Sequence, residues 1–225
     1  MDWKSPNFWL LIAVVALIAV QSYNALAIAG LSSLAALPAQ PSAAIGVQGT
    51  QASASALSGV APTGVPAIYG SELGVSFDDV SASNPALANQ TIQKLGNLDN
   101  TITLSGEAKN RYIGIASRIS CEYCCGAESI IFKNGEPACG CAHSFAMRGL
   151  AKYLLTKHPS EYSDAQILEE MGKWKTLFFP DVMAQKAAVL QQKGIEFNYI
   201  NLASNTYRGI ETGASGGSGS MVGGC

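Results

Sequence analysis

The pattern of hydrophobic and polar positions separates an apolar N-terminal stretch from a longer part with helical periodicity. Phe8–Val20 is an unbroken apolar run. Read as one helix, Phe8–Ile28 is about 31 Å long, enough to span a bilayer. Read as a signal peptide, the run is the hydrophobic region before a small-x-small cleavage site at Ala25–Ala27. Residues 1–31 are therefore predicted to be a transmembrane anchor or a signal peptide, and the early Lys4 predicts that the rest of the chain lies outside.

The next stretch is rich in Ala, Ser, Gly, Pro, Gln and Thr and shows neither a helical nor a strand period. Such a segment does not bury enough apolar surface to offset the entropy of ordering itself. Residues 32–71 are predicted to be a low-complexity flexible linker. The same reasoning makes residues 212–225 a mobile Gly/Ser-rich tail ending in Cys225, and it leaves residues 72–211 as the folded extracytoplasmic domain.

Between these flexible parts, apolar residues recur with helical spacing behind clear helix-start signals. Asn84-Pro85 places a cap before a proline at the first helical position, and Ser163 with Gln166 forms a capping box. Glycine or proline follows most of the periodic segments and ends them. Helices are expected over residues 85–95, 106–119, 142–157, 163–179 and 180–193.

Two short segments predict β structure. Asn134-Gly135 separates the short runs 129–133 and 136–139, and this dipeptide favours the tight turn of a β-hairpin. Residues 195–199 alternate apolar and polar positions, which indicates a short strand. The expected fold class is mostly α with a small β-hairpin, in which an N-terminal transmembrane helix and a flexible linker precede an α-helical domain around a Cys-rich metal-binding hairpin.

Composition changes this picture in two ways. Charged residues make up only 13% of the 225 residues, and none lies between Lys4 and Glu72. From Glu72 onward the composition is that of a soluble domain, so the chain is expected to be a tethered or exported domain and not a polytopic membrane protein. The formal net charge of −2 argues against a nucleic-acid-binding surface. We therefore expect a single-pass cell-membrane protein, or a secreted one if the N-terminal segment is cleaved.

Five of the six cysteines fall within one short stretch, as a CxxCC group, the predicted hairpin and a CxC group entering a helix. Because the hairpin folds the chain back, the two groups can face one ion, and four thiolates at about 2.3 Å suit tetrahedral Zn²⁺. A helix N-terminus also stabilises thiolates. The candidate metal ligands are Cys121, Cys124, Cys125, Cys139, Cys141 and His143.

Other interpretations of these cysteines stay open. Outside the cell an even set of cysteines commonly forms disulfides, and free or catalytic thiols are a third possibility. A fifth clustered thiol exceeds the needs of one zinc ion, so copper(I) or an iron–sulfur cluster is an alternative cofactor. His143 is either a ligand or a core histidine with one hydrogen bond. Cys225 is a late ligand, an attachment thiol or neither.

The order of knuckle, hairpin and helix from Cys121 to Lys157 resembles treble-clef zinc-binding domains, in which two ligands come from the knuckle and two from the start of the helix. The second pair here is CxC where that class has CxxC. The run Ala138–Cys141 resembles the PCYCGC-motif family of exported proteins, whose function is not established.

No phosphate loop, dinucleotide fingerprint, His-Glu-x-x-His or nucleophile elbow is present. The sequence thus favours a membrane-tethered extracytoplasmic zinc-binding domain with a binding or scaffolding role over an enzyme. The membrane, through the N-terminal helix, is its one expected partner. The alternative functions are soft-metal handling and a thiol–disulfide redox protein that uses Cys121 and Cys124.

Overall fold

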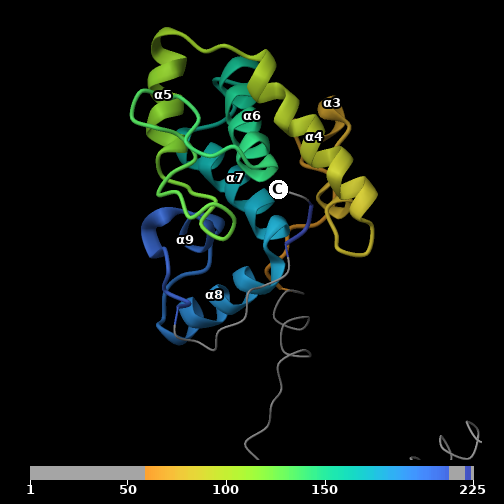
Figure 1. The fold of residues 1–225 in the computed structure, drawn as a ribbon, viewed down its shortest axis with the longest axis vertical. Coiled ribbons are helices and arrows are strands. Elements are labelled where there is room, and N and C mark those ends of the chain that lie inside the picture. The colour runs from red at the N-terminus through yellow and green to blue at the C-terminus, as the bar shows by residue number, and fades with distance from the viewer. Residues whose placement is uncertain (1–58, 213–220, 224–225) are drawn as a thin grey trace, which may run out of the picture. The chain divides into compact units, whose positions relative to one another are not determined.

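The structure is a computed structural model that describes residues 59–212 and 221–223. All of them belong to one compact unit, Gln48–Cys225. Figure 1 shows the helices of this unit packed around α6 and α7. In chain order the elements are α3 (Gly70–Leu73), η2 (Phe77–Asp79), α4 (Pro85–Thr101), α5 (Gly106–Ala116), α6 (Ala142–Lys157), α7 (Asp164–Phe178), α8 (Pro180–Gln192), α9 (Tyr199–Ala203) and η3 (Asn205–Tyr207).

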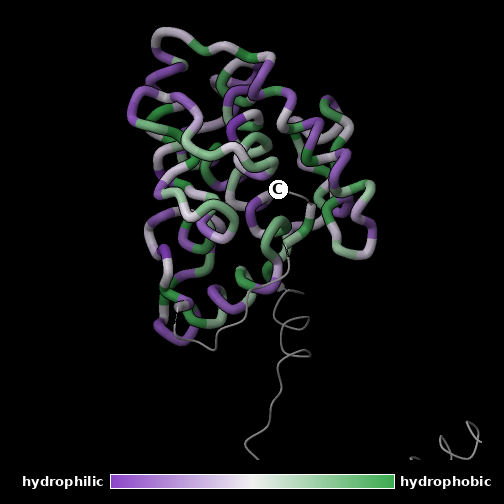
Figure 2. Tube along the Cα trace, in the orientation of Figure 1, coloured by the Kyte–Doolittle hydropathy of each residue, from purple (hydrophilic) through white to green (hydrophobic). Residues whose placement is uncertain are grey.

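The predicted helix starts are confirmed, and those of α4, α6 and α7 carry a side-chain cap. The Asn84 side chain accepts a hydrogen bond from the Leu87 N–H at the start of α4. Ser163 and Gln166 form the expected capping box at the start of α7. Helix α6 has the predicted bounds, and Cys141 is its cap residue. Hydrophobic and hydrophilic residues are mixed along the helices (Figure 2); α4 buries one side, whereas α6 is buried along most of its length, as expected for a central helix.

Helix α4 continues past the predicted end at Gly96 to Thr101, because glycine here serves helix packing and does not end the helix. Helix α6 crosses α4 very closely at Gly149. A side chain at this glycine would collide with the Leu95 carbonyl oxygen and approach the Asp99 amide nitrogen to 2.9 Å. The close crossing is therefore possible only without a side chain at position 149, and it brings the two helices into their extensive contact.

A buried arginine ties the cysteine-bearing loop to this helix pair. The Arg148 guanidinium on α6 is fully buried and pairs with Asp99 on α4, with an Nε–Oδ2 distance of 2.7 Å. Its Nη1 donates to the carbonyls of Ile130 and Cys139, at 3.2 and 2.8 Å. Since a buried guanidinium needs these acceptors, the loop is held against α6 at the place where its cysteines lie.

The packed core begins before Glu72, the start of the domain expected from the sequence. Tyr69 is fully buried, and its hydroxyl donates to Glu170 at 2.8 Å and accepts from the Trp174 indole N–H at 2.8 Å. Trp174 is itself fully buried on α7. Residues just before Glu72, placed in the linker by their composition, thus pack on the central helix.

The predicted β elements are not formed as strands in the described part of the chain. At Asn134-Gly135 the chain does reverse, with one isolated antiparallel bridge between Ile131 and Pro137 and a Phe132 N–H to Glu136 carbonyl bond of 2.8 Å. The turn residues were recognised correctly, but the flanking runs are too short to extend a ladder. The strand expected at residues 195–199 is wrong, because Asn198 caps the short helix α9 there.

The predictions for residues 1–58 lie outside the described residues. Within the described ranges, no helix combines the length and the apolar character that crossing a membrane requires.

Substituting Gly149 tests the helix crossing. We expect Gly149→Ala to lower the free energy of unfolding by about 3 kcal/mol, because a methyl group must push α4 and α6 apart. Gly114→Ala is the matched control, since Gly114 lies in α5 with open space around it, and this change should raise the free energy of unfolding by about 0.5–1 kcal/mol. Denaturant unfolding of both variants measures the difference, and equal effects would contradict the proposed reason for the close crossing.

Candidate metal centre

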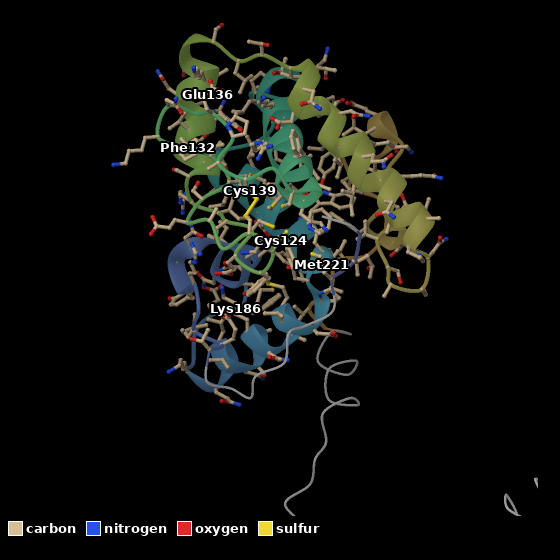
Figure 3. The ribbon with its side chains drawn as sticks, viewed as in Figure 1. Cys124, Phe132, Glu136, Cys139, Lys186 and Met221 are labelled. Atoms are coloured by element: carbon tan, nitrogen blue, oxygen red, sulfur yellow. A yellow bond between two sulfur atoms is a disulfide. The ribbon has the colours of Figure 1, made fainter. Side chains whose placement is uncertain are left out.

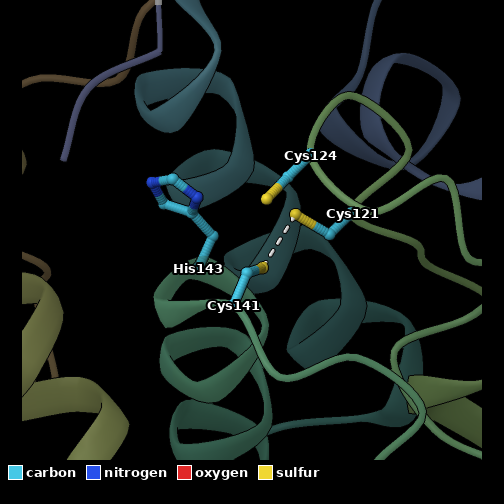
Figure 4. Close-up of side chains that lie close together, drawn as sticks. All are labelled: Cys121, Cys124, Cys141 and His143. Carbon is cyan, nitrogen blue, oxygen red and sulfur yellow. Dashed lines mark hydrogen bonds between the residues drawn. The ribbon is translucent and has the colours of Figure 1, made fainter. Parts of the chain in front are cut away.

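Four side chains from two separate segments converge at the N-terminus of α6. They are Cys121 and Cys124, from the turn that follows α5, with Cys141 and His143 from the start of α6 (Figure 4). One potential ligand atom from each lies within 4.8 Å of all the others. The group is largely withdrawn from solvent, since Cys121, Cys141 and His143 are buried. Together the four could hold a metal ion.

Local backbone geometry aims the first pair of sulfurs. The Cys124 and Cys125 N–H groups both donate to the Cys121 carbonyl, at 3.2 and 3.3 Å, which closes a tight turn. This is the knuckle that the CxxC spacing predicts. It places the Cys121 sulfur 3.3 Å from the sulfur of Cys141.

Cys141 is held by the helix it begins. Its backbone is extended, and its sulfur accepts a hydrogen bond from the Ser144 N–H at 3.4 Å, as a helix cap does. The hydrogen bond between the Cys141 and Cys121 sulfurs is the main cause that lowers the pKa of the Cys141 thiol. Burial opposes this shift, and hydrogen bonds with Ser144 lower the pKa further. The same bond between the two cysteines, together with burial, raises the pKa of Cys121. Without an ion between the two sulfurs, the pair therefore favours a single thiolate, on Cys141, over two thiolates.

His143 presents a bare nitrogen at this group. Its Nε2 lies 2.8 Å from the Val222 carbonyl oxygen, which can only accept, so Nε2 carries the proton. In the neutral ring Nδ1 then has a free lone pair, and this fully buried atom has no hydrogen-bond partner among the described residues. Phe178 and Phe179 pack on the ring, with centroids 4.8 and 5.0 Å away. A backbone carbonyl on the outer nitrogen is the usual support of a metal-binding histidine.

The remaining two candidate ligands take another role. Cys125 and Cys139 are joined in a disulfide, and Figure 3 shows sulfur atoms gathered near the middle of the unit around Cys124 and Cys139. Cys124 is also disulfide-bonded, whereas Cys121 and Cys141 are free thiols. A group that could hold a metal and a disulfide, which the sequence offered as alternatives, thus lie side by side in the structure. Cys124 would become a thiolate ligand only after reduction.

Val222 could not be selected from the sequence. The segment 221–223 lies in the predicted mobile tail, yet Val222 is 97% buried, with only 3% of its surface exposed. Its N–H donates to the Phe178 carbonyl at the end of α7, at 2.9 Å, while its carbonyl accepts from His143. One residue thus connects the C-terminus of α7 to the N-terminus of α6. Only the apolar pair Met221-Val222 within the Gly/Ser-rich tail could have hinted at an apolar anchor.

A buried charged cluster adjoins the sulfurs and was also missed. Lys175 and Lys186 are fully buried and lie 3.1 and 3.4 Å from Glu122 Oε1, next to Cys121 in sequence. Arg208 approaches the other carboxylate oxygen at 3.5 Å. Burial lowers the pKa of Lys175 to about 8, although Glu122 opposes that shift. Lys175 therefore stays a cation near neutral pH, and its charge opposes, without reversing, the rise in the pKa of Cys121.

Comparison with known proteins adds no relative to this geometry, because no family model, no curated protein and no solved structure matches the chain.

Displacing segment 221–223 should expose His143. Gly223 has a φ of +85°, and a side chain there would collide with Ile92. We expect Gly223→Ala to undock the segment, so that the His143 Nε2–H proton exchanges with solvent at least about tenfold faster, since opening becomes easier by about 1–2 kcal/mol. NMR of the imidazole proton measures this.

Gly209→Ala is the matched control. Gly209 also has a positive φ, +71°, but the nearest atom to a side chain there is 3.8 Å away, on Thr212. It should leave the His143 proton protected. If both variants exchange alike, the Val222 carbonyl does not hold the ring.

Proposed function

We propose that this chain is an extracytoplasmic metal-binding protein in which Cys121, Cys124, Cys141 and His143 hold a structural zinc ion. Its role is binding or scaffolding, with the metal fastening the loop of the cysteines to the start of α6. The observation that carries the proposal is the convergence of these four donors around a buried, unpartnered imidazole nitrogen.

The spacing of the donors supports zinc. Zn–S bonds of about 2.3 Å in a tetrahedron place sulfurs roughly 3.8 Å apart. The Cys121 and Cys141 sulfurs lie 3.3 Å apart, and no pair in the group exceeds 4.8 Å. Small side-chain adjustments would suffice, and the thiol protons that now fill the space would leave on binding.

The source of the donors is consistent with the treble-clef resemblance. A knuckle would contribute Cys121 and Cys124, and the first turn of a helix would contribute Cys141 and His143, with histidine in place of the second cysteine of the helix pair. The Cys125–Cys139 disulfide supports an oxidising compartment, as in secreted and cell-surface proteins. Together with the apolar run Phe8–Val20, it supports a domain held outside the membrane by an N-terminal anchor.

A second metal is favoured by one specific observation. With Cys124 in a disulfide, the donors left are two thiols, Cys121 and Cys141, and one imidazole. Three soft donors without a fourth suit copper(I) better than zinc. Copper handling is therefore the alternative for the oxidised protein.

The test is metal analysis of the full chain in detergent, after reduction and removal of excess reductant. We expect one equivalent of zinc, and Co²⁺ in its place should give the absorption of a tetrahedral thiolate site. Cys141→Ser should weaken zinc binding more than about 100-fold, beyond the usual effect of a residue that only supports a ligand. This variant should still fold, because serine is itself a good helix cap.

Cys139→Ser is the matched control, two positions away and in the disulfide. It should keep the zinc affinity if the ligands are those that converge in the structure. Loss of zinc binding in Cys139→Ser with retention in Cys141→Ser would assign the site to the wrong cysteines. Failure of the reduced wild-type chain to bind zinc, with tight binding of copper(I) by the oxidised chain, would replace the first proposal by the alternative.

A further inference from the structure

The sulfurs of the cysteine cluster form a continuous series. The disulfide sulfur of Cys139 lies 3.5 Å from the Cys141 sulfur, which lies 3.3 Å from that of Cys121. Cys139 is bonded to Cys125, while Cys141 and Cys121 are free thiols. A disulfide is thus in contact with a thiol, which is in contact with a second thiol. A structural metal site needs only its own ligands, so this disulfide has no part in the function proposed above.

Contact between a thiol and a disulfide is the starting arrangement for exchange. A thiolate attacks one sulfur of a disulfide, forms a bond to it and expels the other sulfur as a thiolate. To reach a bonding distance of about 2.05 Å, each pair of neighbouring sulfurs here must approach by roughly 1.3–1.5 Å. Side-chain rotation covers such a distance.

We propose that the disulfide moves along this series, from Cys125–Cys139 to Cys121–Cys141, unless a metal ion occupies the two free thiols. The chain would then be a metal-controlled dithiol–disulfide switch. The part played by the metal rests on the proposed function, whereas the exchange itself rests only on the positions of the sulfurs.

The exchange takes two steps and balances within the chain. In the first, the Cys141 thiolate bonds to the Cys139 sulfur, and the Cys125 sulfur leaves as a thiolate. In the second, the Cys121 thiolate bonds to the Cys141 sulfur, and the Cys139 sulfur leaves. Two thiols and one disulfide become one disulfide and two thiols, so no external oxidant is consumed and the protons pass between cysteines.

The surroundings suit both steps. Cys141 caps α6, where the Ser144 N–H already donates to its sulfur and stabilises an attacking thiolate. The intermediate joins Cys139 to Cys141 across Gly140 alone, a tight ring that glycine accommodates best. Gly140 has no neighbour within 4 Å of where a side chain would lie, so the loop has room to adjust.

A metal ion would block the exchange by occupying both moving thiols. An ion bound to Cys121 and Cys141 stabilises the starting pairing by mass action, and at a metal concentration 100 times the dissociation constant the rearranged form falls about 100-fold. The disulfide position would thus report whether the site is filled.

The test maps free thiols in the oxidised full chain under argon, with a chelator, with zinc or with copper(I), the ion that suits the three donors left in the oxidised chain. A trace of a monothiol brings the exchange to equilibrium. Free thiols are alkylated after an acid quench, and cleavage after Glu122 separates Cys121 from Cys124 and Cys125. With chelator we expect the label to move from Cys121 and Cys141 to Cys125 and Cys139. With copper(I) it should stay on Cys121 and Cys141, and with zinc it should stay there to the extent that zinc binds the oxidised chain.

Two variants separate the steps. Cys121→Ser should stop the exchange at the intermediate, with label on Cys125. Cys141→Ser removes the central sulfur and should leave Cys125 and Cys139 unlabelled under all conditions. Far-UV circular dichroism of both shows whether the helices are retained.

The outcomes distinguish this inference from the metal proposal. Zinc binding with label fixed on Cys121 and Cys141 even in chelator would overturn the exchange and leave the metal site standing. A label that moves equally with chelator, zinc and copper(I) supports the exchange and removes the metal's part. Label that appears on Cys124, released from its own disulfide, would overturn the proposed order of sulfurs.

Discussion

The structure depends on how the N-terminus of α6 is buried. A helix begins with N–H groups that lack partners within the helix, and burying them requires acceptors from elsewhere. Here the Cys141 sulfur accepts from Ser144, and the bare Nδ1 of His143 lies beside it. One turn later Arg148 holds the cysteine loop by two carbonyls, and Gly149 allows α4 to close over the other side. The same helix end thus organises the fold and collects the sulfurs.

Features fixed by neighbours in sequence could be predicted, because their cause is local. The bounds of α6 follow from its periodicity and from Pro159, and the caps at Asn84 and Ser163 need only the next three residues. The end of α4 could not be predicted this way. Gly96 ends a helix in isolation, but contact with α6 outweighs the cost of about 1 kcal/mol for glycine in a helix.

The candidate site shows the same division between local and distant causes. Spacing correctly indicated that Cys121 and Cys124 form a knuckle and that Cys141 starts a helix. It could not decide between Cys139 and His143 as the remaining donor, because that depends on which side chain faces the knuckle after the loop is held by Arg148. The role of Val222 could not be predicted from the sequence, since its contacts with His143 and Phe178 join distant parts of the chain.

The sulfur group interacts electrostatically with the neighbouring charged cluster around Glu122. Three cations, the fully buried Lys175 and Lys186 and the partly exposed Arg208, surround two carboxylates, those of Glu122 and Glu211, which leaves one net positive charge. Uncompensated buried charge is costly, so an adjacent negative centre is stabilised. A divalent ion with two thiolates is neutral, as is a disulfide, whereas a divalent ion with three thiolates carries one negative charge. The excess positive charge therefore favours the four-donor centre, in which Cys124 is reduced and contributes a third thiolate. The reduced protein should hold a divalent metal more tightly than the oxidised protein.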